Sequence, residues 1–486
     1  MSPTTTTLRS LFVVLSILTV VQLFQQSYER YHAPLLHLSI QEEDIINLPT
    51  VRIRKSSQKI GGTADADELP TTTKTPSPSQ AKPASQPIRR TDLSTTPQPQ
   101  TSKNITFPLS QSGCYSEACI QQMAQELARP FRFRHDNHNY LIYEQTPETK
   151  GFKDPQGFLL VKTFKAASST AASVVLRIAK RYAPPSGKPD FLWHRWHHTR
   201  GTDYRKRHPQ RSFLWTSVRD PAARAISRIF YTMISWQGHE PTDTNIRFFL
   251  DYNHSQFGST SIHGGFQTWF ISLQGNDEFP IAWNPKQRAK VQNAELVERV
   301  VDRILNDYDF ILLAERLDDS LVVLSFIMNL PIEDYVVLDS KVSGGNNTKA
   351  QQLYYYIEAR NSAENKQKCH PLERPFRSPG ITSYLEGDKW RAKNYGDYLL
   401  VAAVNASLQM TIDEIIGQEA FDQRLQQYRK LKHQVEVVCA AEVRTHCSET
   451  GTPQPDLTKA NCLGDDSGCG WKCINTTLER VLKNQD

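Results

Sequence analysis

The stretch GFLLVKTFKAASSTAASVVLRIAKRY, residues 157–182, decides the fold of this chain. Its first residues form an apolar run that is typical of a buried parallel strand, and its second half carries apolar residues at helical spacing. Two further apolar runs, residues 212–218 and 309–315, are each followed by helical spacing. Strands that alternate with helices predict an α/β domain with a central parallel sheet flanked by helices.

The turn between the first strand and its helix has the composition of an anion-binding loop. Ligands of open α/β sheets bind beyond the carboxyl ends of the strands, and a helix N-terminus adds unpaired N–H groups and partial positive charge. The predicted loop and first helical turn contain Lys162, Thr163, Lys165, Ala167, Ser168, Ser169 and Thr170. Because the Walker glycines are absent, the pattern disfavours a nucleoside triphosphatase or a kinase. An ordinary helix start, with a capping serine and surface lysines, is the structural alternative.

The second strand ends in SVRDPAARAISRIFY, residues 217–231. Asp220 suits a helix N-cap, and Pro221 suits the first helical turn. Ser227 follows Arg219 at a distance of about 12 Å along a helix axis that rises 1.5 Å per residue. Because a guanidinium group matches the geometry of two phosphate oxygens, we expect Arg219 and Ser227 to hold a second phosphate.

These two motifs together resemble the 5′-phosphosulfate loop and the 3′-phosphate site of Golgi carbohydrate sulfotransferases. The closest likeness is to the galactose 3-O-sulfotransferase group, which includes galactosylceramide sulfotransferase. The loop of that group, K-T-H-K-T-x-S-S-T, corresponds to KTFKAASST, residues 162–170, and its R-D-P with a later serine corresponds to Arg219 and Ser227. Residues 309–338 and 393–408 resemble further segments of the group, so the likeness covers roughly residues 157–432.

The resemblance implies a P-loop-like sulfotransferase domain that uses 3′-phosphoadenosine 5′-phosphosulfate (PAPS) as donor and needs no metal ion. The implied reaction transfers a sulfuryl group to a sugar hydroxyl, in the first place O-3 of galactose on a glycolipid or glycoprotein. Lys162 and Lys165 are implied to neutralise charge on the bridging phosphate oxygen, while the hydroxyl residues of the loop hold the 5′-phosphate. Arg219 and Ser227 are implied to hold the 3′-phosphate.

The loop does not identify the catalytic base, because the histidine of the family loop is Phe164 here. The segment FLWHRWHHTR, residues 191–200, is similar to a family run of Asn-His-x-Arg-x-His and places His194 and His198 at the histidine positions. An imidazole titrates near neutral pH, so we expect His194 to be the general base, with His198 as the alternative. Surface histidines beside packed tryptophans are the structural alternative.

The charge of the chain does not decide between neutral and acidic sugar acceptors. The net charge is +6, and residues 177–211 hold ten Lys/Arg against two Asp, a field that concentrates anions. A uronic-acid 2-O-sulfotransferase that acts on a polysaccharide is therefore an alternative. A non-catalytic, sulfotransferase-like glycan-binding protein is another, because Phe164 cannot act as a base. Glu315 and Gln267 are weaker candidates for orienting a base or binding acceptor hydroxyls. No nucleic-acid partner is expected, and a homodimer stays open.

The N-terminal region indicates a membrane protein of the secretory pathway, and the resemblance implies the Golgi membrane. The apolar run LFVVLSILTVVQLF, residues 11–24, is shorter than the ~20 residues of a full span, but no small-x-small cleavage pattern follows it. We therefore expect residues 1–27 to form a cytosolic tail and an uncleaved signal anchor, in a single-pass type II topology with a lumenal catalytic domain. Eight cysteines fit an oxidising lumen. The N-x-S/T sequons are at Asn104, Asn253, Asn346, Asn405 and Asn475.

The remaining domain boundaries follow from composition. Residues 28–110 are rich in Pro, Ser and Thr, and no Phe, Trp or Tyr occurs between residues 33 and 106, which predicts a disordered stem. Residues 111–433 form the expected sulfotransferase domain. Residues 434–486 hold five cysteines and are expected to be a disulfide-stapled cap, because their spacings lack the C-x2-C pairs of a zinc site. Cys114 and Cys119 are expected to close a small loop, which leaves Cys369 for a partner in the tail.

Overall fold

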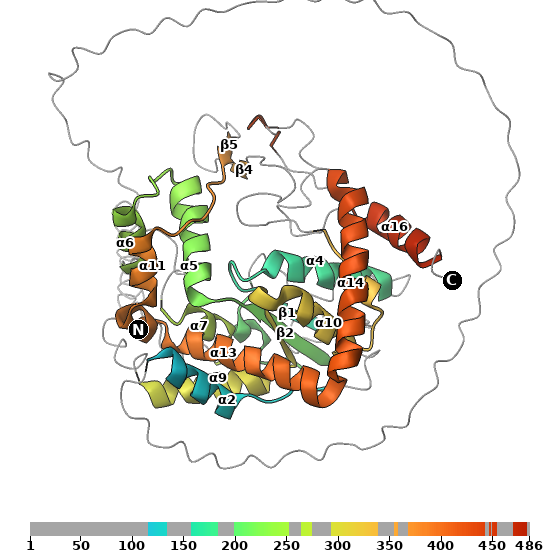
Figure 1. The fold of residues 1–486 in the computed structure, drawn as a ribbon, viewed down its shortest axis with the longest axis horizontal. Helices are drawn as coiled ribbons and strands as arrows, with labels where there is room; N and C mark the ends of the chain where they lie inside the picture. The colour runs from blue at the N-terminus through green and yellow to red at the C-terminus, as the bar shows by residue number, and fades with distance from the viewer. Residues whose placement is uncertain are drawn as a thin grey trace, which may run out of the picture. The chain divides into compact units, whose positions relative to one another are not determined.

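The computed structural model shows an α/β fold in which a small parallel sheet lies among many helices (Figure 1). The residues that the structure describes are 115–133, 157–182, 199–251, 264–274, 293–338, 354–357, 368–442, 447–448, 450–453 and 470–483. The expected membrane anchor, the stem and the segment with His194 and His198 lie outside these residues. Expectations about those parts therefore stay predictions.

The central sheet contains three parallel strands in the order β1-β2-β3. These strands are β1 (Gly157–Val161), β2 (Ser212–Val218) and β3 (Phe310–Leu313). Every residue of the three strands is buried, which is why each strand is a continuous apolar run and not an alternating pattern. In the view of Figure 1, helix α4 (Ser168–Tyr182) lies above the sheet and α13 (Tyr395–Met410) lies below it. The three strands and the parallel sheet predicted from the sequence are confirmed.

The register of the sheet brings the carboxyl ends of the strands together. Val161 of β1 pairs with Thr216 of β2, and Val218 of β2 pairs with Leu313 of β3. The chain leaves β1 into the lysine-rich loop, leaves β2 at Arg219, and leaves β3 into a short 3-10 helix. The two predicted anion motifs therefore emerge from neighbouring strands at the same edge of the sheet.

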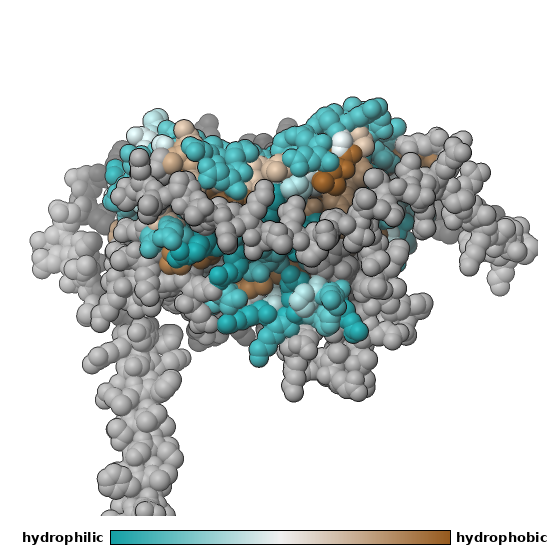
Figure 2. All heavy atoms as spheres, turned by 90° about the horizontal axis from the view of Figure 1, so that it is seen from below, coloured by the Kyte–Doolittle hydropathy of each residue, from teal (hydrophilic) through white to brown (hydrophobic). Residues whose placement is uncertain are grey.

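Two hydrophobic cores organise the helices. The larger core surrounds the sheet, and its further helices are α2 (Glu117–Leu127), α7 (Phe266–Ile271), α9 (Ala294–Asp307), α10 (Leu317–Ile327), α14 (Gln418–Cys439) and α16 (Trp471–Lys483). The smaller core is formed by α5 (Pro221–Ile229), the π-helix η4 (Phe230–Trp236), α6 (Asp243–Asp251), α11 (Pro379–Glu386) and α12 (Asp388–Lys393). On the face drawn in Figure 2, the described residues are mostly hydrophilic, with small hydrophobic patches among them.

Short elements complete the described parts of the chain. The 3-10 helices are η3 (Gly201–Tyr204), η9 (Ala314–Arg316), η10 (Ile332–Tyr335) and η12 (Ala440–Glu442), and η11 (Thr411–Ile416) is a π-helix that continues α13. Strands β4 (Tyr354–Ile357) and β5 (Lys368–Pro371) form a separate antiparallel pair. Residues 336–338 are buried but belong to no strand.

Among the described residues, one continuous helical segment, Tyr395–Ile416, is long and apolar enough to cross a membrane. More than half of this segment is buried inside the molecule, where α13 packs against α2, α9 and β3. A buried helix at the centre of a globular domain has the same length and composition as a membrane span. The contacts of α13 are those of a core helix.

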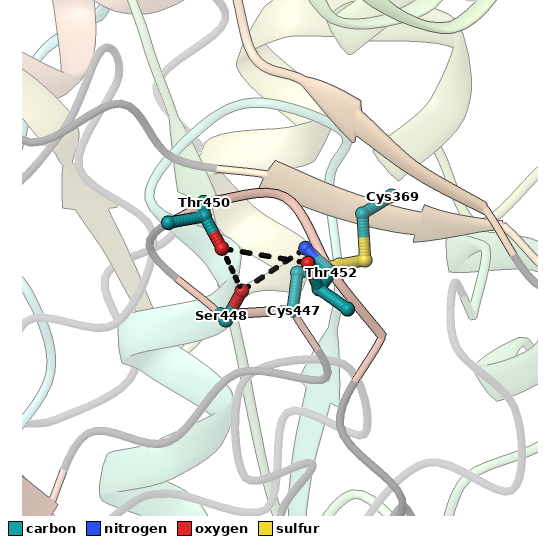
Figure 3. The surroundings of a disulfide bond; sticks show 5 residues. All are labelled: Cys369, Cys447, Ser448, Thr450 and Thr452. Atoms are coloured by element: carbon teal, nitrogen blue, oxygen red, sulfur yellow. Dashed lines mark hydrogen bonds between the residues drawn. A yellow bond between two sulfur atoms is a disulfide. The ribbon is translucent and has the colours of Figure 1, made fainter. Parts of the chain in front are cut away.

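Disulfides tie the C-terminal part of the chain to the rest. Cys369, in β5, is bonded to Cys447 (Figure 3), and Cys439, at the end of α14, is bonded to Cys473 of α16. The expectation that Cys369 has a partner in the tail is confirmed. Cys119 also forms a disulfide, and its expected partner, Cys114, lies outside the described residues. The expected division between residues 433 and 434 falls inside α14.

Candidate anion-binding site at the ends of two strands

The loop after β1 is shaped by its own backbone. Lys165 and Ala167 have φ angles of 60° and 57°, in the left-handed region that side-chain-bearing residues rarely adopt. Such a conformation costs about 1–2 kcal/mol per residue. These two residues let the chain change direction between Val161, the end of β1, and Ser168, where α4 begins. Strain of this kind, held in place by the surrounding structure, is common at ligand-binding loops.

Buried polar groups hold the start of this loop against the sheet. The hydroxyls of Thr163 and Thr216 are 3.1 Å apart, and the Thr216 hydroxyl donates to the carbonyl of Val161 at 2.8 Å. Thr163 is fully buried, so its hydroxyl fastens the loop to β2. Lys162 is also buried, with 1% of its surface exposed. The predicted ligands Ser168, Ser169 and Thr170 form the first turn of α4.

Aromatic side chains surround the other half of the loop. The ammonium group of Lys165 lies 3.9 Å from the centre of the Tyr231 ring, which the π-helix η4 presents. Phe164 packs edge-on against Phe266 and Phe270 of α7, with ring centres 6.1 and 5.6 Å away. The guanidinium group of Arg228 lies 5.0 Å from the Phe164 ring. Phe164 is therefore part of an aromatic cluster.

Arg219 joins the two strand ends. Its Nη1 donates to the carbonyl of Lys165 at 3.3 Å, and its Nε lies 3.9 Å from Oε1 of Glu315, in η9 after β3. Burial lowers the pKa of Arg219, while the nearby carboxylates of Glu315 and Asp220 oppose that shift. The structure thus brings the predicted residues Lys165 and Arg219 into direct contact.

Asp220 begins α5 as the sequence predicts. Its carboxylate accepts from the Ala223 N–H at 2.6 Å, and Pro221 occupies the first turn. The Asp220 N–H donates to Glu315 at 2.9 Å. Arg377, from the segment between β5 and α11, lies 3.7 Å from the Asp220 carboxylate. This arginine offsets one of the two negative charges beside Arg219.

Ser227, the second predicted ligand of the 3′-phosphate, lies on α5 and is 3% exposed. Arg219 precedes α5 directly after β2, and Ser227 lies within that helix. Glu315 is half-buried, and desolvation raises the pKa of its carboxyl group. Glu315 lies beside Arg219, the predicted 3′-phosphate residue.

Both polar atoms of the Gln267 amide are hydrogen-bonded. Its Oε1 accepts from the Arg219 N–H at 2.9 Å, and its Nε2 donates to the Arg219 carbonyl at 2.7 Å. Gln267 is 0% exposed, so the structure does not favour the suggestion that it binds acceptor hydroxyls. Among the described residues, no group of three or more His, Cys, Asp or Glu is placed to hold a metal ion.

All the residues predicted to hold the donor lie in the described part of the chain, in the segments that follow β1 and β2, whereas the predicted bases His194 and His198 do not. Sequence reasoning missed Tyr231, which ends the quoted stretch 217–231 but lies outside its Arg-Asp-Pro motif. It also missed Arg377, which reaches the site from a segment without a motif of its own. Comparison of the chain with protein-family models, with curated proteins and with solved structures finds no match.

Proposed function

We propose that this protein is a carbohydrate sulfotransferase that transfers a sulfuryl group from PAPS to a sugar hydroxyl. The observation that carries the proposal is the contact between Arg219 and the Lys165 carbonyl, at the ends of adjacent parallel strands. It joins a lysine-rich loop at a helix N-terminus to an arginine at a second helix N-terminus. A ligand with two phosphate groups, such as the adenosine bisphosphate part of PAPS, suits two neighbouring cationic strand ends.

Different side chains bind the two phosphate groups of the donor. Lys162, Lys165 and the first turn of α4 are proposed to bind the 5′-phosphosulfate, while Arg219 and Ser227 bind the 3′-phosphate. The oxygen of the sugar hydroxyl attacks sulfur, the bond from sulfur to the 5′-phosphate oxygen breaks, and adenosine 3′,5′-bisphosphate leaves. Lysine charge compensates the negative charge that develops on the leaving oxygen, as cations do in phosphoryl transfer.

The hydroxyl proton needs a base, for which we propose His194, with His198 as the alternative. A positioned base contributes ~10²–10⁴-fold to turnover, so His194→Ala should lower kcat by about that factor with donor affinity unchanged. His198→Ala made in parallel identifies which histidine acts. Turnover within about threefold of wild type for both variants contradicts the assignment.

The cellular setting follows the same proposal. Disulfides such as Cys369–Cys447 and Cys439–Cys473 persist in oxidising compartments and support a lumenal location. We propose a single-pass type II protein of the Golgi membrane whose acceptor is a glycan. The acceptor proposed first is O-3 of galactose on a glycolipid or glycoprotein, and a uronic-acid polysaccharide is the competing acceptor.

A second candidate function rests on Phe164. Its ring belongs to an aromatic cluster and carries no titratable group, so Phe164 cannot take the place of the loop histidine as a base. A sulfotransferase-like protein that binds the bisphosphate and a glycan without turnover would have this feature. Turnover separates the two functions, because both require the donor site and only one requires a base.

The deciding experiment incubates the purified full chain with sulfur-labelled PAPS and a glycan panel. Neutral galactosides, uronic-acid polymers and a reaction without acceptor form its arms, and calorimetry with adenosine 3′,5′-bisphosphate runs beside it. Label in galactosides supports the proposal, and label in uronic acids selects the competing acceptor. Bisphosphate binding without transfer supports the non-catalytic function. Absence of bisphosphate binding overturns the donor site.

A further inference from the structure

The backbone of Arg219 is held by a side chain that mimics a strand. The Gln267 amide accepts from the Arg219 N–H at 2.9 Å and donates to the Arg219 carbonyl at 2.7 Å. A residue of a neighbouring antiparallel strand makes the same pair of hydrogen bonds. The amide therefore replaces a strand neighbour for the first residue beyond β2 and fixes its peptide groups at the edge of the sheet.

Gln267 is itself held in place by Asp397 of α13. It lies in the first turn of α7, where the Asp397 carboxylate accepts from the N–H groups of Gln267 and Thr268 at 3.1 and 2.9 Å. The Thr268 hydroxyl donates to the same carboxylate at 2.9 Å. Asp397 is 0% exposed, and burial raises its pKa, while the positive charge of Arg224 opposes that shift. These three hydrogen bonds tie the N-terminus of α7 to α13.

Close packing of the two helices makes this cap possible. Gly396 precedes Asp397 in α13, and a Cβ atom at that position would lie 3.1 Å from Val297 and 3.2 Å from the Thr268 hydroxyl. These separations are tighter than ordinary contacts, so the side chains of Val297 and Thr268 would have to shift by a few tenths of an ångström to admit a larger residue. The absence of a side chain at Gly396 allows the carboxylate of its neighbour to reach the helix N-terminus.

The side chain of Arg219 is held less firmly than its backbone. It makes one hydrogen bond of 3.3 Å to the Lys165 carbonyl and an ion pair of 3.9 Å with Glu315. Both are long, and the Glu315 carboxylate is half-exposed, so each contributes little. The direction of the guanidinium group therefore depends on the backbone conformation that the Gln267 amide imposes.

We propose that Gln267 is a positioning residue of the donor site, which fixes the Arg219 backbone so that the guanidinium group is presented to the 3′-phosphate. This inference rests on the proposed function, because it assigns Arg219 to phosphate. Gln267 does not touch the donor. It acts through Arg219, and Asp397 acts in turn through the N-terminus of α7.

The test is a double-mutant cycle measured by calorimetry with adenosine 3′,5′-bisphosphate on the full chain. Gln267→Met keeps the length of the side chain and removes both hydrogen bonds. Because a lost buried hydrogen bond corresponds to roughly a tenfold change in an equilibrium constant, we expect about tenfold weaker binding in the wild-type background. In the Arg219→Ala background the same change should alter affinity by less than about twofold, since no guanidinium group remains to be positioned.

The cycle separates positioning from a general structural effect. The backbone bonds of residue 219 remain in Arg219→Ala, so Gln267→Met should lower the unfolding midpoint similarly in both backgrounds. An equal loss of affinity in both backgrounds, or no loss in either, overturns the positioning role. If the wild-type chain does not bind the bisphosphate, the proposed function fails and the inference fails with it. If wild type binds and Arg219→Ala weakens binding, only the positioning role is at stake.

Gln267→Glu supplies a readout that does not depend on the stability of the methionine variant. A protonated glutamic acid donates to the Arg219 carbonyl as the amide does, whereas a carboxylate cannot. The charged groups bonded to Gln267 are Arg219 and Asp397, through backbone and side-chain hydrogen bonds. Glu315 lies beside Arg219, and Arg224 interacts with both Arg219 and Asp397. Affinity relative to wild type should therefore recover as pH falls from about 8 to about 5.5, because burial raises a carboxyl pKa. A ratio that stays constant across this range overturns the proposal.

Discussion

The two strand ends that form the candidate site are built in different ways. After β1, the chain turns through two left-handed residues, Lys165 and Ala167, within a single loop. After β2, one residue, Arg219, is held by contacts from three separate segments: the β1 loop, α7 and the end of β3. The first end is a local structure that carries strain. The second is an assembly whose geometry depends on residues far away in the sequence.

This difference predicts which substitutions should affect each strand end. Substitutions inside the β1 loop should change its own strain and its own ligand contacts. The β2 end should respond to substitutions at distant positions, such as Gln267 or Arg377, that no motif connects with it. Both ends also carry different charge, because carboxylates lie beside Arg219, whereas the described part of the β1 loop contains lysines and no acidic residue. Four measurements test this contrast.

The largest effect is expected for Arg219→Ala. Loss of hydrogen bonds to a charged group should weaken binding of adenosine 3′,5′-bisphosphate by roughly 1.5–3 kcal/mol, as measured by calorimetry. The thermal stability of the unliganded chain should be nearly unchanged, because the backbone bonds to Gln267 remain. Arg211→Ala, an exposed arginine at the amino end of β2, is the matched control and should bind normally. Unchanged affinity in Arg219→Ala contradicts the donor-site assignment.

Ala167→Gly tests the strain in the β1 loop. Glycine adopts the observed φ of 57° freely, so removal of strain should exceed the added flexibility of the unfolded chain and raise the free energy of unfolding by up to about 1 kcal/mol. Chemical denaturation measures this change. Ala171→Gly, one turn into α4, is the control with the opposite sign and should lose at least ~0.5–1 kcal/mol. A destabilised Ala167→Gly variant would show that the loop is not strained.

Arg377→Ala tests whether a distant segment supports the β2 end. Removal of its charge leaves Asp220 uncompensated beside the ligand, so bisphosphate binding should weaken by up to about fivefold at low salt, the range of a partly exposed ion pair. High salt should reduce the effect because the pair is accessible to screening. Asp220→Asn in the same background should restore affinity, since asparagine still caps α5. Arg374→Ala, on the same segment, should have no effect, and an equal loss there would argue against a specific role for Arg377.

The smallest effect is expected for Glu315→Gln and concerns pH. Desolvation raises the pKa of Glu315 in the folded chain, so the native state favours its protonated form. The resulting stabilisation is present below the unfolded pKa of about 4.3 and is lost as pH rises through the folded value. Glutamine does not titrate, so the variant should gain on wild type between about pH 4 and pH 7 in denaturation curves. Parallel curves, or a gain by wild type, contradict this.

Much of the site was predictable because its signals are local. An apolar run followed by polar turn residues and helical spacing predicted β1, β2 and β3, and the order Arg-Asp-Pro predicted the N-cap at Asp220. Parallel strands place their carboxyl ends at one edge, so the neighbourhood of Lys165 and Arg219 also follows from the pattern. The disulfide from Cys369 to the tail followed from counting cysteines.

Other features could be decided only by the tertiary structure. The hydrogen bonds from Gln267 to Arg219 join residues 48 positions apart. The Asp397 cap of α7 and the approach of Arg377 to Asp220 join residues 129 or more positions apart. No local propensity encodes such contacts, because they depend on how helices pack around the sheet. The sequence by itself determined which groups can bind an anion, through the chemistry of two short segments. The packing of α7, α13 and the segment before α11 decided how one of those groups is held, because a buried polar group must find its partners wherever the fold places them.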